Sequence, residues 1–345
     1  MENLRFNALT KPFIIAEMSG NHNQSLERAL RIVDAAAEAG VDAIKLQTYT
    51  ADTMTLDLNE GDFFISNPQS PWYGSSLYAL YQKAHTPWAW QEKIFVRARE
   101  HGLICFSTPF DATAVDFLEE LGAPCYKIAS FENTDLPLIR KVAQTGKPLV
   151  VSTGMATVAD LDELVRTARE NGCSDITLLK CTSSYPATPA GSNILTIPHM
   201  KALFGCNVGL SDHTLGIGAA VASIALGATV IEKHFTLARA DGGVDSAFSM
   251  EPEEMAQLVR ECRTAWEALG EISYNVQAQE EKSLVFRRSL YIVEDMKAGE
   301  VITEGNMRAI RPGYGLSPRY YDVLLGRRVG CNVRRGTPLS WELLS

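Results

Sequence analysis

Short apolar segments alternate with amphipathic segments of helical length through most of the chain. The apolar segments are rich in β-branched residues and end in polar side chains, a pattern typical of buried parallel strands separated by helices. Eight segments have this character, at residues 13–17, 43–47, 103–108, 125–130, 148–154, 176–181, 208–214 and 230–236. Together they predict an α/β fold, a (β/α)8 TIM barrel with its active site at the carboxyl ends of the strands.

The pattern changes after the eighth strand. An amphipathic helix at residues 251–269 is expected to close the barrel, and a polar stretch rich in Gln and Glu follows it. From Leu284 onward, short apolar runs and turn residues predict a small β-rich domain. We therefore expect a barrel domain at residues 1–270, a linker at 271–283 and a C-terminal domain at 284–345.

Two predicted strand ends carry the same side chain. His213 ends the seventh strand and His234 the eighth, and the segment between them has helical length. A strand–helix–strand unit places its strands side by side and parallel, so both imidazoles are expected on one rim. There they can share a divalent cation. The alternative is that each histidine only donates to a nearby carbonyl.

Other polar side chains are expected on the same rim. Lys45 and Lys127 lie in otherwise apolar strands, where an inward charge needs a counter-ion. Lysines combined with short hydroxyl donors suit a phosphate, unless they point outward between the helices. The remaining candidates end or follow strands: Glu17, Gln47, Thr108, Ser130, Glu132, Ser152, Thr153, Ser183, Ser211 and Asp245.

Residues 48–87 separate the second strand from the next helix, a far longer connection than the usual βα loop. Such an insertion is expected to form a substrate wall or to pack on the flank of the barrel. Its aromatic residues are candidates to cover a sugar ring: Phe63, Phe64, Trp72, Tyr73, Tyr78 and Tyr81.

Charge and cysteine usage narrow the class of protein. The net charge of -9 argues against nucleic acid or an anionic membrane as partner. The seven scattered cysteines favour free thiols in a reducing compartment, and no apolar run reaches the length of a membrane span. These features, with the lack of a signal-peptide pattern at residues 1–12, predict a cytoplasmic protein.

Several motifs together resemble the sialic acid synthase family, whose members condense phosphoenolpyruvate with an N-acetylated amino sugar. The matching segments extend over almost the whole chain, at residues 16–17, 21–23, 45–48, 107–110, 126–130, 152–155, 181–182, 185–186, 209–213 and 232–236. The resemblance implies a TIM barrel followed by an antifreeze-protein-like (SAF) domain, and a homodimer in which each SAF domain caps the partner's barrel.

Within the family, the chain resembles the pseudaminic acid synthase branch. Sialic acid synthases usually have Gly-x-Asn-His-Asn-Gly in the first loop and Gly-Pro-Asp-His after the second metal histidine. This chain has Ser-Gly-Asn-His-Asn-Gln at 19–24 and Gly-Gly-Val-Asp-Ser-Ala-Phe-Ser at 242–249. The branch implies 2,4-diacetamido-2,4,6-trideoxy-L-altrose as the sugar, with Val244, Ala247 and Phe248 suited to its 6-methyl group.

The resemblance also implies a role for each candidate. His213 and His234 would hold Mn²⁺ or Mg²⁺, and Glu17 or Glu132 would act as base. The sugar would contact Gln47, Tyr185, Asp245 and Arg311, the last reaching over from the partner subunit. Phosphoenolpyruvate would be bound by Lys45, Thr108, Lys127, Ser130, Ser152, Ser183 and Ser211.

Three other functions compete with this one. The first is the same chemistry on another sugar, as in an N-acetylneuraminic or legionaminic acid synthase. The second is a metal-dependent TIM-barrel hydrolase, although such enzymes often have a His-x-His motif on the first strand, which is missing at residues 13–17. The third is a carbohydrate-binding protein without catalysis.

Overall fold

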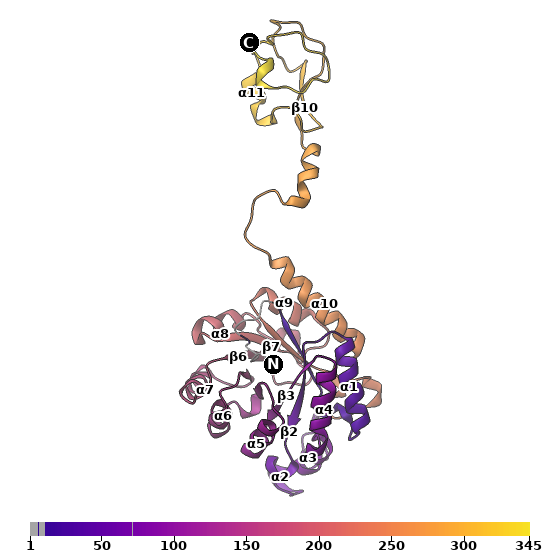
Figure 1. Cartoon of the computed structure of the whole chain (residues 1–345), viewed down its shortest axis with the longest axis vertical. Helices are drawn as coiled ribbons and strands as arrows, with labels where there is room; N and C mark the ends of the chain where they lie inside the picture. The colour runs from indigo at the N-terminus through magenta and orange to yellow at the C-terminus, as the bar shows by residue number, and fades with distance from the viewer. Residues whose placement is uncertain (1–5, 7–10, 71) are drawn as a thin grey trace. The chain divides into compact units, whose positions relative to one another are not determined.

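The computed structural model describes residues 6, 11–70 and 72–345, so the start of the predicted barrel domain, at residues 1–5 and 7–10, lies outside the described residues. The chain forms two compact units, Met1–Gly270 and Glu271–Ser345. The first is a closed barrel of eight parallel strands, as predicted (Figure 1). Its strands are β1 (Phe13–Glu17), β2 (Ala43–Thr48), β3 (Ile104–Pro109), β4 (Tyr126–Ile128), β5 (Leu149–Ser152), β6 (Ile176–Cys181), β7 (Asn207–Ser211) and β8 (Val230–His234).

Helices surround the barrel and connect successive strands (Figure 1). Side-chain caps begin several of them; Ser25 accepts a hydrogen bond from the backbone N–H of Arg28, and Thr157 forms a capping box with Asp160. The surrounding helices are α1 (Leu26–Glu38), α4 (Trp88–Glu100), α5 (Ala112–Glu120), α6 (Leu136–Ala143), α7 (Val158–Glu170), α8 (Thr196–Phe204), α9 (Gly218–Ala225) and α10 (Pro252–Leu269).

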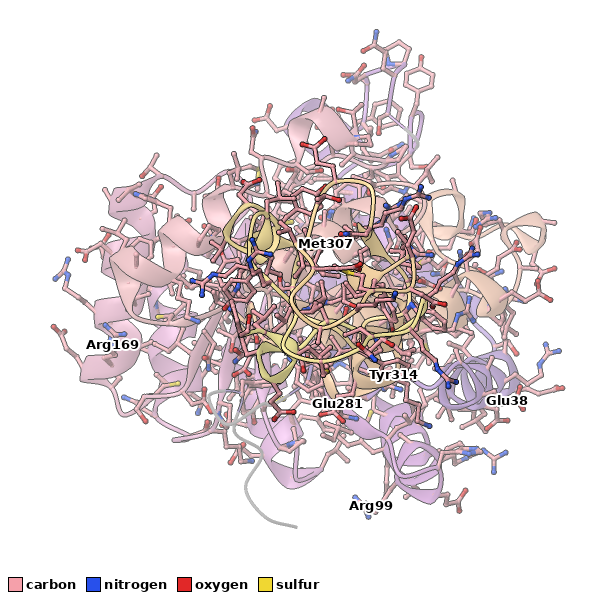
Figure 2. All side chains as sticks on the ribbon, turned by 90° about the horizontal axis from the view of Figure 1, so that it is seen from above. Glu38, Arg99, Arg169, Glu281, Met307 and Tyr314 are labelled. Atoms are coloured by element: carbon pink, nitrogen blue, oxygen red, sulfur yellow. The ribbon has the colours of Figure 1, made fainter. Side chains whose placement is uncertain are left out.

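These helices bury apolar faces against the strands and turn charged faces outward. Figure 2 shows Glu38, Arg99 and Arg169 projecting from the outer faces of α1, α4 and α7. Among the described residues, none of the helices is both long and apolar enough to cross a membrane.

The register of the strands places the rim. β1 pairs with β2 and with β8, which sets Glu17 beside both Lys45 and His234. β7 pairs with β8 so that Ser211 lies opposite Glu232. Because side chains alternate between the two faces of a strand, residues two apart point into the barrel together. Rim and interior residues therefore form successive layers.

An apolar layer lies directly below the polar rim inside the barrel. Its members include Phe13, Ile15, Ala43, Phe106, Cys125, Val150, Leu179 and Val230. Glu17, Lys45 and Glu232 each follow a member of this layer by two residues in the same strand. Lys127 follows Cys125, which directly precedes β4. These polar side chains therefore lie directly above a buried apolar layer.

The insertion after β2 is folded. It contains two short helices, α2 (Ala51–Met54) and α3 (Leu77–Ala84), and the 3-10 helix Gly61–Phe63. None of the residues of α3 is buried. Periodicity does not reveal helices this short inside a long polar segment, so the sequence predicted only a loop here.

The second unit is a small β-rich structure. Its strands β9 (Ser289–Ile292) and β10 (Met307–Ile310) are antiparallel, and it also contains the short helix α11 (Tyr321–Leu324). The predicted linker overlaps the 3-10 helix Ala278–Phe286. The core of this unit consists of Leu290, Ile292, Met296, Ile302, Met307, Leu324, Val329, Val333 and Leu339.

Candidate active site

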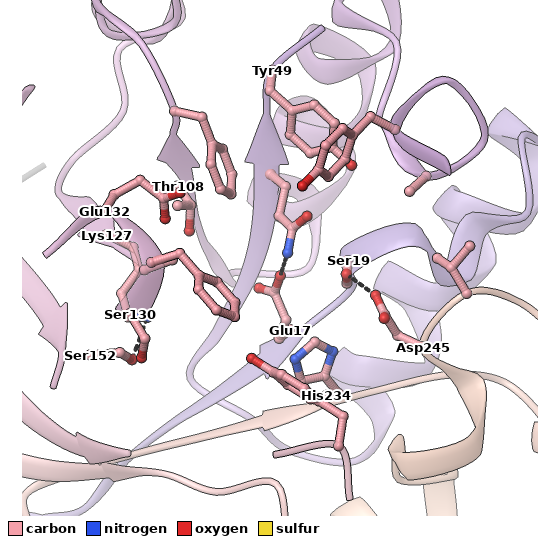
Figure 3. Close-up of a pocket in the computed structure, with 18 of the residues that line it drawn as sticks. Glu17, Ser19, Tyr49, Thr108, Lys127, Ser130, Glu132, Ser152, His234 and Asp245 are labelled. Carbon is pink, nitrogen blue, oxygen red and sulfur yellow. Dashed lines mark hydrogen bonds between the residues drawn. The ribbon is translucent and has the colours of Figure 1, made fainter. Parts of the chain in front are cut away.

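A cavity of about 320 Å³ opens at the carboxyl ends of the barrel strands (Figure 3). The structure brings together in its lining most of the side chains that the sequence placed on the rim: Glu17, Lys45, Gln47, Thr108, Lys127, Ser130, Glu132, Ser152, Tyr185, Ser211, His213, His234 and Asp245. Ser183 and Arg311 are not in this lining. Arg311 belongs to the second unit, where its side chain is exposed.

Two lysines and two glutamates form a buried charge network at the base of the cavity. Lys45 Nζ lies 2.5 Å from Glu17 Oε2 and 3.8 Å from Glu232 Oε2. Lys127 Nζ lies 3.3 Å from Glu232 Oε1. None of the four residues is more than 4% exposed. Buried charges are tolerated when they are paired in this way, and the inward orientation predicted for both lysines is confirmed.

Glu232 is the counter-ion that sequence reasoning missed. It accepts hydrogen bonds from Lys127 Nζ and, at 3.0 Å, from Ser211 Oγ. The alternation of β8 gave the signal, since Glu232 lies between Val230 and His234, which also point inward. Burial would raise the pKa of Glu232, but Lys127 and Lys45 outweigh burial and lower it to about 2. Glu232 therefore stays ionised and keeps both lysines in place.

Hydroxyl groups surround the lysines and complete an anion site. Lys45 donates to Thr108 Oγ1 at 3.1 Å, and Lys127 donates to Ser152 Oγ at 2.7 Å. Ser130 Oγ accepts from the backbone N–H of Gly154 at 3.2 Å. Cations and hydroxyl donors that converge from several strands suit the oxygens of a phosphate and a carboxylate.

Gly154 explains the place of Ser183. A Cβ added at Gly154 would lie 2.2 Å from Ser183 Oγ and 2.7 Å from Ser130 Oγ. Only glycine allows these two hydroxyl groups to approach the backbone so closely. Ser183 thus lies next to Gly154, as Ser130 does, at the border of the anion site.

The two histidines face each other across the rim, with ring centroids 5.4 Å apart. His213 Nδ1 donates to the carbonyl of Thr182 at 3.1 Å, which leaves the Nε2 lone pair free. His234 Nδ1 is buried without a hydrogen-bond partner, and burial lowers the pKa of His234 well below its usual value. Burial would also lower the pKa of His213, but Cys181 outweighs burial and raises it, so a cation there competes with a proton. The two free nitrogens of the pair are thus Nε2 of His213 and Nδ1 of His234.

This pair fits a divalent cation that also binds substrate or water. Neutral imidazole nitrogens are good ligands for such ions. Among the described residues, no group of three or more His, Cys, Asp or Glu side chains is arranged to hold a metal ion. The protein would therefore contribute His213 and His234, and substrate oxygens would complete the coordination. Tyr185 and Phe248 pack on the imidazoles, with ring centroids 4.5 Å from His213 and 5.0 Å from His234.

Two carboxylates near the network differ in their surroundings. Glu17 accepts from Gln47 Nε2 at 3.0 Å and is ion-paired with Lys45. Burial raises the pKa of Glu17 to about 7, although Lys45 lowers it. Glu132 Oε2 is buried without a hydrogen-bond partner, and burial raises the pKa of Glu132 to about 7. The two carboxylates thus differ in their contacts and not in their pKa. A carboxylate with a pKa near neutrality is suited to general base catalysis.

The remaining wall comes from the insertion and from the loop after β8. Trp72 Nε1 donates to the carbonyl of Val244 at 3.1 Å, and Asp245 accepts from the hydroxyl of Ser19. Of the six aromatic residues singled out from the sequence, Trp72 and Tyr81 line the cavity. Outside the lining lie Phe63, Phe64, Tyr73 and Tyr78.

The structure separates the three residues expected near a sugar methyl group. Val244 lines the cavity. Phe248 is buried against the imidazoles, and Ala247 is exposed. Phe248 and Ala247 are not in the cavity lining, so Val244 is the one of these three residues that faces the cavity.

Comparison with known proteins identifies the family. Residues 32–274 match the NeuB family and residues 287–345 match the SAF domain. A pseudaminic acid synthase of Campylobacter jejuni is 42% identical over 334 residues, 97% of each chain. An N,N'-diacetyllegionaminic acid synthase of the same species is 35% identical over 323 residues, 92% of this chain and 96% of that one.

A solved structure leads to the same family. The N-acetylneuraminic acid synthetase of Leptospira borgpetersenii is 30% identical, with a TM-score of 0.71 over 80% of this chain and 90% of that one. The chain belongs to the NeuB family of synthases, and a SAF domain follows its TIM barrel. The family and the fold predicted from the sequence are thus confirmed.

Proposed function

We propose that this chain is a pseudaminic acid synthase. It condenses phosphoenolpyruvate with 2,4-diacetamido-2,4,6-trideoxy-L-altrose and water, and releases pseudaminic acid and phosphate. The observation that carries this proposal is the convergence of Lys45, Lys127 and their serine neighbours beside His213 and His234 on one rim. The chain is more similar to a pseudaminic acid synthase than to a legionaminic acid synthase, which favours the altrose derivative as the sugar. Legionaminic acid synthase activity is the alternative.

The base of the cavity binds phosphoenolpyruvate. Lys45 and Lys127 neutralise its phosphate and carboxylate, and hydroxyl groups of the rim donate to the remaining oxygens. Bound in this way, its C3 attacks the aldehyde carbon of the open-chain sugar. His213 and His234 would hold a divalent cation, Mn²⁺ or Mg²⁺, and such an ion would supply Lewis-acid stabilisation of the charge that develops on the aldehyde oxygen. The hydroxyl groups that donate to the phosphoenolpyruvate oxygens are those of Thr108, Ser130, Ser152, Ser183 and Ser211.

Glu132 acts as the base for the second step. Its carboxylate accepts a proton from the water that adds at C2 of phosphoenolpyruvate, and the tetrahedral intermediate then expels phosphate. Glu17 is less suited to this role, because Lys45 and Gln47 already bind its oxygens. We therefore assign Glu17 to holding Lys45 and Gln47 in place.

The sugar lies against Gln47, Tyr185 and Asp245. Arg311 of a second chain contacts its N-acetyl group in a homodimer whose SAF domains cap the partner barrels. The small size of the second unit supports this arrangement, since a domain of this size has a limited core and gains stability from docking. The reaction takes place in the cytoplasm, where phosphoenolpyruvate is available.

Phosphate release from phosphoenolpyruvate, measured with a panel of amino sugars, tests the proposal. The highest kcat/KM is expected with the trideoxy diacetamido altrose. Turnover of only N-acetylmannosamine or of the legionaminic acid precursor would establish the alternative. No phosphate release with any sugar would contradict synthase activity.

A further inference from the structure

Helix α3 of the insertion turns one side toward the cavity. Leu77, Leu80, Tyr81 and Ala84 all line it, and their spacing of three and four residues places them on one helical face. This face is not buried in the protein core, because none of the residues of α3 is buried. An apolar face that is half-exposed above a substrate cavity is suited to an apolar part of the ligand.

The loop after β8 continues this wall. A Cβ added at Gly20 would lie 2.3 Å from Val244 Cγ2 and 3.2 Å from the carbonyl oxygen of Ala84. Val244 and the end of α3 therefore meet at Gly20, and Trp72 binds the carbonyl of Val244. The wall comes from three separate loops that converge on one side of the cavity.

The anion site lies away from this wall. Figure 3 places Lys127, Ser130 and Ser152 on one side of the cavity, and Asp245, which follows Val244, on the other. The aldehyde carbon of the sugar must approach the bound phosphoenolpyruvate. The far end of the open chain, its C6, consequently extends away from the anion site.

We propose that the wall formed by Leu77, Leu80, Ala84 and Val244 is the subsite for the C6 methyl group of the sugar. This inference rests on the proposed function and names the residues that contact C6 of the sugar, which carries no hydroxyl group. These four side chains offer a hydroxyl group at C6 no hydrogen-bond partner. The polar groups next to them are the hydroxyl of Tyr81 and the carboxylate of Asp245, which already accepts from Ser19.

Gln24 holds α3 in this position. Its side-chain Nε2 donates to the carbonyl of Lys83 at 3.0 Å and to that of His85 at 2.7 Å, at the carboxyl end of the helix. The backbone of Gln24 has a φ of 54°, the left-handed region that favours glycine. A glutamine there costs conformational energy that glycine avoids, and its amide provides two hydrogen bonds to the wall. Gln24 is thus a positioning residue for the subsite.

The first test compares two sugars that differ only in a hydroxyl group at C6. For Leu80→Asn, kcat/KM with the 6-deoxy sugar is expected to fall about tenfold or more, while kcat/KM with the 6-hydroxy sugar stays unchanged or rises. Leu80→Met is the matched control, since it keeps an apolar side chain of similar volume and should keep the preference.

The outcomes separate this inference from the proposed function. A wild-type enzyme that prefers the 6-hydroxy sugar would overturn both. A wild-type enzyme that prefers the 6-deoxy sugar, with an equal loss on both sugars in Leu80→Asn, would overturn the subsite alone.

The second test uses Gln24→Gly and Gln24→Ala. Both remove the amide, so both are expected to raise the KM for the sugar several-fold and to leave the KM for phosphoenolpyruvate unchanged. Gln24→Gly relieves the left-handed backbone, and its Tm should exceed that of Gln24→Ala. An unchanged sugar KM in both variants would show that the amide does not position the wall.

Discussion

The charge network at the base of the cavity and the wall of Leu77, Leu80, Ala84 and Val244, hereafter the α3 wall, are built in opposite ways. The base consists of strand residues whose places follow from the barrel register, and its charges are buried and paired. The wall consists of half-exposed apolar residues, Leu77, Leu80 and Ala84 on the short helix α3 and Val244 in the loop after β8, and side-chain hydrogen bonds of Gln24 and Trp72 hold it. A rigid scaffold thus carries the charged chemistry, and loops carry the contacts that depend on the sugar.

This contrast separates the consequences of substitutions. A change at the base is expected to lower turnover with every sugar, because each sugar reacts with the same phosphoenolpyruvate. A change in the wall is expected to alter the order of preference among sugars.

Removal of one histidine is expected to have the largest effect. His213→Ala or His234→Ala should lower kcat by about a thousandfold or more with every sugar, because Lewis-acid stabilisation contributes several kcal/mol. The apo-protein Tm should change little, since the imidazoles lie on the rim rather than in the core. Mn²⁺ binding measured by electron paramagnetic resonance, without substrate, should be lost in both variants. Full activity after complete chelation would refute the metal assignment.

Loss of the proposed general base, Glu132, is expected to have the second-largest effect on kcat. Glu132→Gln should lower kcat by about 10²–10⁴-fold, the usual contribution of a general base. The pKa of Glu132 is raised to about 7, so the carboxylate is protonated below that pH and cannot accept a proton. The wild-type rate should therefore decline as the pH falls through about 7, and this decline should be shallower in Glu132→Gln. The pKa of Glu17 is also raised to about 7 by burial, so Glu132→Gln with Glu17→Gln is the matched double variant that removes both carboxylates.

A stability measurement distinguishes catalysis from folding in this variant. A carboxyl group whose pKa is raised by burial destabilises the folded state at a pH above that pKa, where it must be ionised. Glu132→Gln removes this cost and should have an equal or higher Tm at pH 8. A large drop in Tm at pH 8 would mean that Glu132 has a structural role that its hydrogen bonds do not reveal.

Lys127→Met should act mainly on phosphoenolpyruvate. Loss of a charge-assisted contact to an anion is expected to raise its KM about a hundredfold, with the sugar KM nearly unchanged. The single variant also leaves Glu232 without its 3.3 Å partner and should lower the Tm. Glu232→Gln combined with Lys127→Met restores neutrality and should recover the Tm without recovering phosphoenolpyruvate use. A loss confined to the sugar KM would assign Lys127 to the other substrate.

The two regions also differ in how far the sequence predicts them. The sequence predicted Lys45 and Lys127 from their position as charges in otherwise apolar strands, and the period-two alternation and parallel pairing of those strands fix their orientation and neighbours. The counter-ion Glu232 obeys the same rule but had not been assigned. The α3 wall was not predictable in detail, because its position depends on hydrogen bonds between Gln24 and a segment about sixty residues away in sequence.

Substitution of Arg311 is expected to have the smallest effect on activity, and it tests whether the second unit contributes a residue to the sugar site. If Arg311 contacts the N-acetyl group, Arg311→Ala should raise the sugar KM about tenfold to a hundredfold and leave the phosphoenolpyruvate KM unchanged, as for a charge-assisted hydrogen bond.

Complementation tests whether Arg311 serves the active site of a partner subunit. Arg311→Ala chains and His213→Ala chains are dissociated, mixed and allowed to reassociate, and a mixed dimer with swapped SAF domains pairs one intact barrel with one intact Arg311. Activity with sugar well below the KM of Arg311→Ala should then rise above the sum of the two parents. Mixed dimers without such a gain would show that Arg311 serves its own barrel or none.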